Sequence, residues 1–381
     1  MIPNLRFDQL MGLIEKVFGL QASESGVAVM VDLPSDEVPD HPDWNDRRRI
    51  AAEWFAELAE NLSQTPFAAA RLARYRNVGT NNGDLPPSVS VVEAPLADPE
   101  RASARSLPLE QLLERSSVVL SVTEFSATAP LKILARSRRF RGATLPGFSR
   151  AMIPALGLDY EKVHARVLQF KERLDRAESA RIRFQVDGEN RPRELLLDLR
   201  YRTGHASGGL IREPGTVGNL PSGEAYIVPY EGERSGEASR SAGELPVQFG
   251  EEVVLFRIEG NRVREVLSQG RHAELQRGRL EQEPAYGNLA ELGIGVLGEW
   301  GIEAVGSTLL DEKLGVHIAF GRSEHFGGIT GPSAFSDPKR VVHIDWVYVP
   351  SVQPRVKLIE MTFEYAPAAT ETIVRSGAYV V

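Results

Sequence analysis

The run Val341-Val-His-Ile-Asp-Trp-Val-Tyr-Val349 is almost continuously apolar, which is typical of a strand buried on both faces. Asp345 stands out, because an unpaired carboxylate inside such a strand would be very costly. Side chains two residues apart on a strand point to the same face, so His343 and Asp345 lie next to each other there. The run therefore predicts a strand that presents an imidazole and a carboxylate, both possible metal ligands, on one face.

More potential ligands precede this strand. Three of the chain's seven histidines, His317, His325 and His343, fall between residues 291 and 345. The chain has no cysteine, so a transition metal would be held by imidazole and carboxylate, a ligand set that suits zinc, manganese, cobalt or iron(II). A single histidine in an apolar stretch is more often a hydrogen-bonded core residue. The metal hypothesis therefore depends on the combination of residues.

Composition limits the classes of protein that fit. The chain has 381 residues, 42% of them hydrophobic and 25% charged, which is typical of a globular protein with room for two domains. A formal net charge of -8 argues against nucleic-acid binding. No segment approaches the ~20 apolar residues that span a bilayer. The first twenty residues predict an amphipathic helix and not a signal peptide, so we expect a cytoplasmic protein that binds no membrane.

The pattern of elements changes near residue 150. Before it, expected strands at 26–31, 88–92 and 118–122 alternate with helices, which predicts an α/β domain with a parallel sheet over residues 1–150. No glycine-rich phosphate loop follows these strands, so nucleotide binding is not favoured. After it, a helix over 159–180 precedes short strands and a polar segment, 231–244, that predicts a mobile loop. We expect residues 151–381 to form a larger mixed α+β domain that carries the metal site.

Four segments resemble the aminopeptidase T/S family of dinuclear metallo-aminopeptidases. Gly218-Asn-Leu-Pro-Ser-Gly-Glu-Ala-Tyr-Ile-Val-Pro229 is similar to an Asn-Leu-Pro-x-Gly-Glu segment of that family, and Asn288-Leu-Ala-Glu-Leu-Gly-Ile-Gly295 to a second. Leu310-Asp-Glu-Lys-Leu-Gly-Val-His-Ile-Ala-Phe-Gly321 and His343-Ile-Asp345 match the third and fourth. The segments occur in family order over about residues 145–360. The N-terminal domain is similar only in its α/β character.

The resemblance implies a metal-dependent hydrolase that releases N-terminal residues from peptides, and a homodimer. It implies two divalent ions, of zinc, cobalt or manganese, and makes Glu312 an additional ligand or the general base. The metal ligands that it implies are Glu224, Glu291, His317, His343 and Asp345.

One position departs from the family pattern. A tyrosine follows the first histidine by about seven residues in the better-known peptidases, and here that position is Glu324, beside His325. A hydrogen-bond donor for the transition state is therefore missing at its expected place, and His325 is the candidate to replace it. An exposed loop is the plain alternative for both residues.

Two other functions stay open. The same fold family includes iron(II) ring-cleaving dioxygenases that act on dihydroxypyridines, for which His317, His343 and Asp345 could supply the ligands of a single iron. A non-catalytic metal-binding protein is the other. The presence of Glu224 and Glu291 favours two metals, and with them the peptidase.

Overall fold

Two units make up the chain, and the computed structural model describes residues 2–94 and 104–381. The first unit comprises Met1–His164 and Ser207–Ser222, and the second comprises Ala165–Ala206 and Gly223–Val381. Helix α6 (Tyr160–Arg176) contributes to both.

A seven-stranded sheet, in the order β10-β6-β5-β1-β2-β3-β4, forms the first unit. Its strands are β1 (Val27–Leu33), β2 (Ala70–Arg76), β3 (Ser88–Ala94), β4 (Arg105–Pro108), β5 (Val118–Ser121), β6 (Arg141–Thr144) and β10 (Val217–Asn219). The strands from β10 to β2 pair in parallel, whereas β3 and β4 are antiparallel. The expected parallel sheet is thus seen in part. The strand expected at 88–92 is present as β3 but runs antiparallel to β2. The residues of a strand do not by themselves determine the direction in which it pairs.

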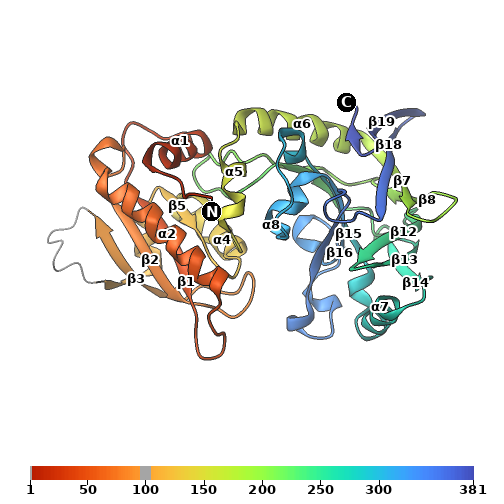
Figure 1. Ribbon diagram of the computed structural model, residues 1–381, viewed down its shortest axis with the longest axis horizontal. Coiled ribbons are helices and arrows are strands. Elements are labelled where there is room, and N and C mark those ends of the chain that lie inside the picture. The colour runs from red at the N-terminus through yellow and green to blue at the C-terminus, as the bar shows by residue number, and fades with distance from the viewer. Residues whose placement is uncertain (1, 95–103) are drawn as a thin grey trace. The chain divides into compact units, whose positions relative to one another are not determined.

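Helices cover this sheet. They are α1 (Phe7–Phe18), α2 (Pro42–Glu60), α3 (Leu109–Glu114), α4 (Thr128–Arg138) and α5 (Ile153–Leu156). Helix α2 begins at Pro42, whose fixed φ suits a first helical position, and His41 caps it by accepting a hydrogen bond from the Trp44 backbone. It lies along β1 and β2 (Figure 1) and buries Trp44 and Trp54 there. Burial of such large side chains holds the helix in place.

Two antiparallel sheets build the second unit. One has eight strands in the order β14-β13-β12-β8-β7-β18-β19-β20, and the other has five in the order β17-β16-β15-β11-β9. The eight strands are β7 (Ala177–Val186), β8 (Arg193–Asp198), β12 (Ala242–Phe249), β13 (Glu252–Glu259), β14 (Arg262–Val266), β18 (Val356–Tyr365), β19 (Ala369–Arg375) and β20 (Ala378–Tyr379). The five strands are β9 (His205–Ser207), β11 (Glu224–Ile227), β15 (Leu289–Gly295), β16 (Val316–Gly321) and β17 (His343–Val347). Helices α7 (Arg271–Gln282) and α8 (Thr308–Asp311) complete the unit.

Aromatic side chains join these two sheets. The ring of Phe320 on β16 lies 5.3 Å from that of Phe256 on β13 and 6.2 Å from that of Trp346 on β17. Tyr348 packs against Phe184 of β7 at 4.7 Å. One face of the five-stranded sheet is therefore core, and its opposite face is available for a site.

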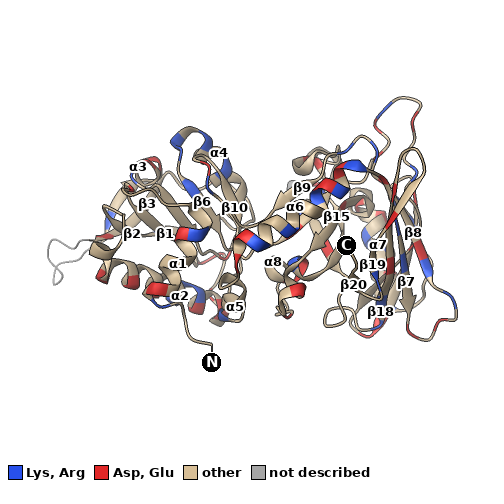
Figure 2. Ribbon diagram, turned by 90° about the horizontal axis from the view of Figure 1, so that it is seen from above, with Lys and Arg blue, Asp and Glu red and all other residues tan. Residues whose placement is uncertain are grey.

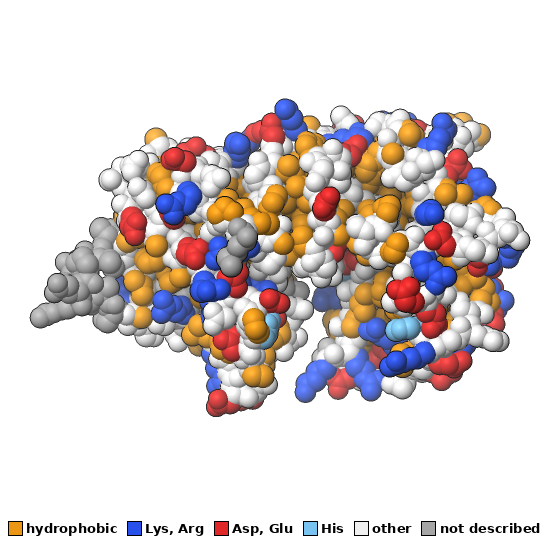
Figure 3. All heavy atoms as spheres, viewed as in Figure 1, with side chains coloured by type: hydrophobic (Ala, Val, Ile, Leu, Met, Phe, Trp, Pro, Cys, Tyr) orange, Lys and Arg blue, Asp and Glu red, His pale blue; other side chains and the backbone are white. Residues whose placement is uncertain are grey.

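Charged residues of both signs lie along the central strands of the eight-stranded sheet, as the bands on β7, β8 and β18 show (Figure 2). Arg181 pairs there with Glu194 and Glu364. Acidic and basic side chains are also interspersed over each unit on the face seen in Figure 3. Within the described residues, no helix has both the length and the apolar character needed to cross a membrane.

Candidate metal centre

Strand register brings the five sequence-predicted ligands to one face of the five-stranded sheet. Residues paired across antiparallel strands point to the same face. The pairs in question are Glu224↔Gly295, Gly293↔His317, Glu291↔Ala319, Ala319↔Asp345 and Gly321↔His343. Apart from Val347, which pairs with His317 on β17, the partners of the ligands are glycine or alanine, which leaves space above the sheet for the longer side chains.

The five side chains form two groups that share Glu291. In one group, His317 Nε2 lies 3.2 Å from Glu291 Oε1 and 3.6 Å from Glu224 Oε2. In the other, His343 Nε2 lies 3.3 Å from Glu291 Oε2 and 3.4 Å from Asp345 Oδ1. Both imidazoles therefore direct the same nitrogen toward the same carboxylate, from two different strands.

Backbone carbonyls orient the two imidazole rings. His317 Nδ1 lies 3.3 Å from the carbonyl oxygen of Gly315, and His343 Nδ1 lies 2.8 Å from that of Arg322. A carbonyl oxygen only accepts, so each Nδ1–H donates and, in the neutral ring, the Nε2 lone pair faces the carboxylates. This is the arrangement in which outer hydrogen bonds present histidine to a metal.

Buried charge also fits a cation at this place. Glu224 Oε2 is buried and has no hydrogen-bond partner among the described residues. Burial alone would raise the pKa of Glu291, but hydrogen bonds from His317 and His343 lower it to about 2. The pKa of His317 rises to about 9, because its carboxylate neighbours outweigh the effect of burial. A divalent ion would satisfy the same carboxylates with both imidazoles neutral.

Lys313 is a site residue that the sequence argument missed. Its side chain is 2% exposed, and its Nζ lies 2.5 Å from Glu224 Oε1 and also contacts Glu312 Oε1. The adjacent carboxylates raise the pKa of Lys313 against the effect of burial, so it is a fixed positive charge. In the sequence Lys313 directly follows Asp311 and Glu312, so its position gave no sign that it would be buried.

The two sequence-predicted catalytic residues lie at the margin of the ligand groups. Glu312 belongs to neither group and contacts Lys313, and burial together with nearby carboxylates raises its pKa to about 8. The ring of His325 lies 5.4 Å from that of His343, and its pKa falls to about 4 through burial and the proximity of His343. Glu324, at the position of the family tyrosine, pairs with Arg322 at 2.7 Å.

Aromatic side chains border the ligands. Tyr226 pairs with Gly293 across β11 and β15, so it lies on the ligand face, and its ring packs 4.8 Å from that of Phe326. His205 stacks on Tyr226 at 5.0 Å, and the ring of Phe326 lies 5.6 Å from that of His343. We call His205, Tyr226 and Phe326 the aromatic wall. The sequence argument did not identify it, because it depends on the register of β11 and on a loop conformation.

Glu231 anchors the loop that carries Phe326. Its carboxylate is 2% exposed and accepts hydrogen bonds from Asn288, Ser323 and Thr330, and from the backbone of Ile329. The segment 231–244 was expected to be a mobile loop, and residues 233–238 are exposed, but the side chain of its first residue is buried and its last three residues begin β12. The polar composition predicted that these side chains would be exposed. The Glu231 carboxylate can be buried because four donors satisfy its hydrogen bonds.

Glu231→Gln is expected to loosen this loop. The amide keeps the shape but replaces one acceptor oxygen by a donor that faces other donors, which costs about 1–3 kcal/mol. Hydrogen exchange of the amides between residues 323 and 330 should accelerate by roughly tenfold or more. Glu233→Gln, which alters a more exposed partner of Arg202, is the matched control. Equal exchange in both variants would show that Glu231 is no anchor.

Gly293 provides the space that His317 occupies. A Cβ built on Gly293 would lie 1.9 Å from His317 Nε2, so the imidazole rests directly over this glycine. Gly293→Ala is therefore expected to displace the ring, lowering the bound metal per chain and costing about 1–3 kcal/mol of stability. Metal analysis after dialysis and thermal unfolding measure both effects. Gly278→Ala, where a Cβ meets nothing within 4 Å, should leave the bound metal unchanged and raise stability by about 0.5–1 kcal/mol, because alanine suits the interior of helix α7 better than glycine.

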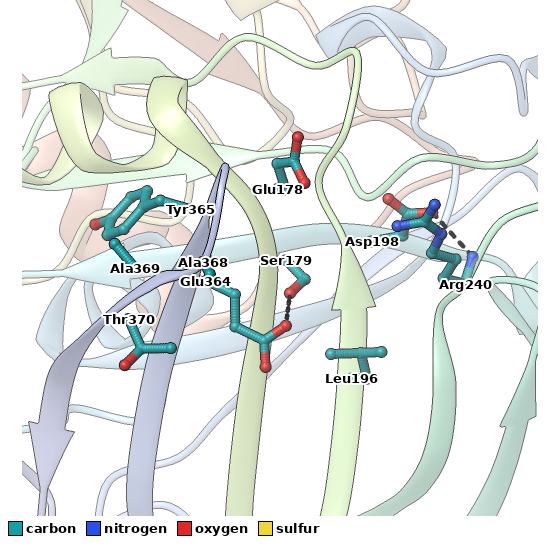
Figure 4. Close-up of a pocket in the computed structure, with 10 residues that line it drawn as sticks. All are labelled: Glu178, Ser179, Leu196, Asp198, Arg240, Glu364, Tyr365, Ala368, Ala369 and Thr370. Carbon is teal, nitrogen blue, oxygen red and sulfur yellow. Dashed lines mark hydrogen bonds between the residues drawn. The ribbon is translucent and has the colours of Figure 1, made fainter.

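A separate hollow of about 330 Å³ lies on the eight-stranded sheet and contains no ligand-group residue (Figure 4). Two of its three carboxylates, those of Glu364 and Asp198, already have partners. Glu364 accepts from Ser179 at 2.5 Å, and Asp198 pairs with Arg200 and accepts from the Arg240 backbone. Among the described residues, the candidate metal-ligand groups lie on the five-stranded sheet and not at this hollow.

Comparison with solved structures finds the same fold in 2,5-dihydroxypyridine dioxygenase from Pseudomonas putida KT2440. The match has a TM-score of 0.60 and 16% sequence identity, and it covers 99% of this chain and 98% of the other. No protein-family model matches the chain, and no curated protein does.

The expectation of an aminopeptidase T/S protein is corrected by this finding. The solved structure matched along both chains is a dioxygenase, so the hydrolase, aminopeptidase and metalloprotease assignments are wrong. The four segments on which they rested build a strand-mounted ligand set, and such a set serves more than one chemistry on one fold. The more general expectation of a metal site is supported, because the predicted ligands form two candidate metal-ligand groups on the five-stranded sheet.

Proposed function

We propose that this protein is an iron(II) dioxygenase that opens the ring of a dihydroxylated nitrogen heteroaromatic compound. The observation that carries the proposal is the convergence of His317 Nε2 and His343 Nε2 on the shared carboxylate of Glu291 at one sheet face. Two histidines and one carboxylate are the ligand set of many mononuclear iron(II) oxygenases. The fold shared with 2,5-dihydroxypyridine dioxygenase supports the same reaction class.

His317, His343 and Asp345 are the proposed iron ligands. When bound, iron(II) supplies the one-electron chemistry that lets dioxygen react with an aromatic ring, and both oxygen atoms enter the ring-opened product. Glu291 faces the Nε2 atoms of both histidines, so its carboxylate is placed beside the same ion, whereas the carbonyls of Gly315 and Arg322 hold the two rings. Glu312 and His325 flank the ligands and are the proposed groups that accept and return protons of the substrate.

One metal, and not the two that the resemblance implied, agrees with the charges of the site. Four carboxylates meet here, those of Glu224, Glu291, Glu312 and Asp345, and Lys313 already contacts two of them. One divalent ion and this ammonium together offset three of the four negative charges. The two ligand groups also share Glu291, whose carboxylate contacts both histidines. A homodimer stays a prediction.

The test is oxygen consumption by anaerobically purified protein reconstituted with iron(II). We expect about one iron per chain, dioxygen uptake upon addition of 2,5-dihydroxypyridine, and a product heavier than the substrate by two oxygen atoms. A zinc-loaded sample should bind its metal and consume no oxygen, since zinc has no redox chemistry. Metal-loaded protein that leaves dihydroxypyridines and dihydroxybenzenes unchanged in oxygen would overturn the proposal and favour a metal-binding protein without this catalysis.

A further inference from the structure

We propose that the aromatic wall is the surface on which the substrate ring binds, and that the Tyr226 hydroxyl donates a hydrogen bond to a ring hydroxyl. The inference rests on the proposed function for the class of substrate. It goes further by naming the residues that select a flat, hydroxylated ring.

Register places Tyr226 beside the proposed ligands. Tyr226 pairs with Gly293, and Gly293 pairs with His317 on the next strand. Because Gly293 has no side chain and the His317 ring rests over it, no other side chain of these three strands separates Tyr226 from His317 at this level of the sheet. A ring that contacts Tyr226 on this face therefore lies within reach of the ligand groups.

Interlocking contacts make the wall a defined surface. Tyr226 and Phe326 pack edge to face at 62°, whereas His205 stacks nearly parallel to Tyr226 at 20°. The backbone carbonyl of Phe326 lies 2.9 Å from His205 Nε2 and ties the ring of His205 to the loop. Phe326 in turn lies next to His343. The wall thus runs from β11 to the second proposed histidine ligand, and aromatic faces of this kind favour a planar ring over a peptide chain.

The Tyr226 hydroxyl is a free donor on this surface. It makes no hydrogen bond within residues 2–94 and 104–381, although its ring is half-buried. Other tyrosine hydroxyls of this unit are bonded, as with Tyr286 to Gln276 and Tyr348 to the carbonyl of Pro246. A half-buried ring with an unused hydroxyl next to a ligand group is suited to orienting a hydroxylated substrate.

Calorimetric titration without oxygen tests the inference, because binding is then measured without turnover. The probes are 2,5-dihydroxypyridine, 2-hydroxypyridine and 3-hydroxypyridine, added to iron-loaded protein. Tyr226→Phe should weaken 2,5-dihydroxypyridine about tenfold, as for one lost hydrogen bond. It should also weaken the one monohydroxy analogue that keeps the bonded hydroxyl and leave the other unchanged. Tyr226→Ala should weaken all three by a further factor of about ten through lost ring packing.

Tyr201→Phe is the matched control, since Tyr201 is an exposed tyrosine paired with Glu237. Iron per chain should stay at the wild-type value in every variant, and loss of iron in Tyr226→Phe would overturn the inference in favour of a structural role. Wild-type affinities in both Tyr226 variants would overturn it while leaving the proposed function intact. No binding of any probe by the wild type would instead remove the proposed substrate class and this inference with it.

Discussion

His343→Ala is expected to abolish iron binding and, with it, dioxygen uptake. The imidazole supplies an Nε2 that lies within 3.4 Å of two carboxylates, and its Nδ1 is already held by the carbonyl of Arg322. Losing an outer contact of a metal site costs 10–100-fold in affinity, so losing a ligand should cost more than roughly 100-fold. Iron per chain after gel filtration and the oxygen electrode measure the two effects.

Asp345→Asn separates charge from shape at the neighbouring ligand. The amide is nearly isosteric but uncharged and a weaker ligand, so iron content should fall there as well. His272→Ala is the control, because His272 stacks on Phe249 outside the ligand groups. Circular dichroism should show an unchanged fold in all three variants. An iron content equal to wild type in His343→Ala would refute the ligand assignment.

Lys313→Met is expected to give the largest loss of stability of any single change at this site. The ammonium is almost fully buried and contacts two carboxylates, so its removal leaves buried negative charge unpaired. Breaking one partner of a buried ion pair costs about 3–5 kcal/mol. Urea unfolding of the metal-free protein measures the loss, and Lys357→Met, at a lysine whose side chain is 60% exposed, should stay within about 0.5 kcal/mol of wild type.

A double-mutant cycle keeps this prediction decisive even if the single variant folds poorly. Adding Glu224→Gln to Lys313→Met removes the charge that Lys313 neutralised, so part of the lost stability should return. Additive losses in the double variant would mean that the two side chains do not interact, contrary to their 2.5 Å separation.

Local pattern was enough to predict one part of the site and not the rest. The alternation of a strand places His343 and Asp345 on one face, and β17 does run from His343 to Val347. Burial of Lys313 and the position of Tyr226 depend on which strand pairs with which, and no local pattern encodes that. The same limit explains β3, whose residues read as a strand but whose direction follows from its neighbour β2.

The sequence also failed to predict the exact ends of some elements and the class of reaction. The expected helix 159–180 ends at Arg176, and β7 begins at Ala177, because Ala177 and the alternation after it suit a strand paired with β8 and β18. Motifs around His317 and His343 indicated a metal site, but they led to the wrong reaction class. Ligand residues determine that a cation binds, whereas the surrounding residues determine which reaction it serves.

The alternation of β16 has an evolutionary consequence. His317 faces the proposed metal, while the residues on either side of it, such as Ile318, belong to the core. Natural selection can therefore change residues on the ligand face, or the loops that border it, while the packing that specifies the fold stays the same. The five-stranded sheet is a platform on which new reactions can arise by few substitutions, so proteins with this architecture should be sorted by the residues that border their ligands and not by the ligands themselves.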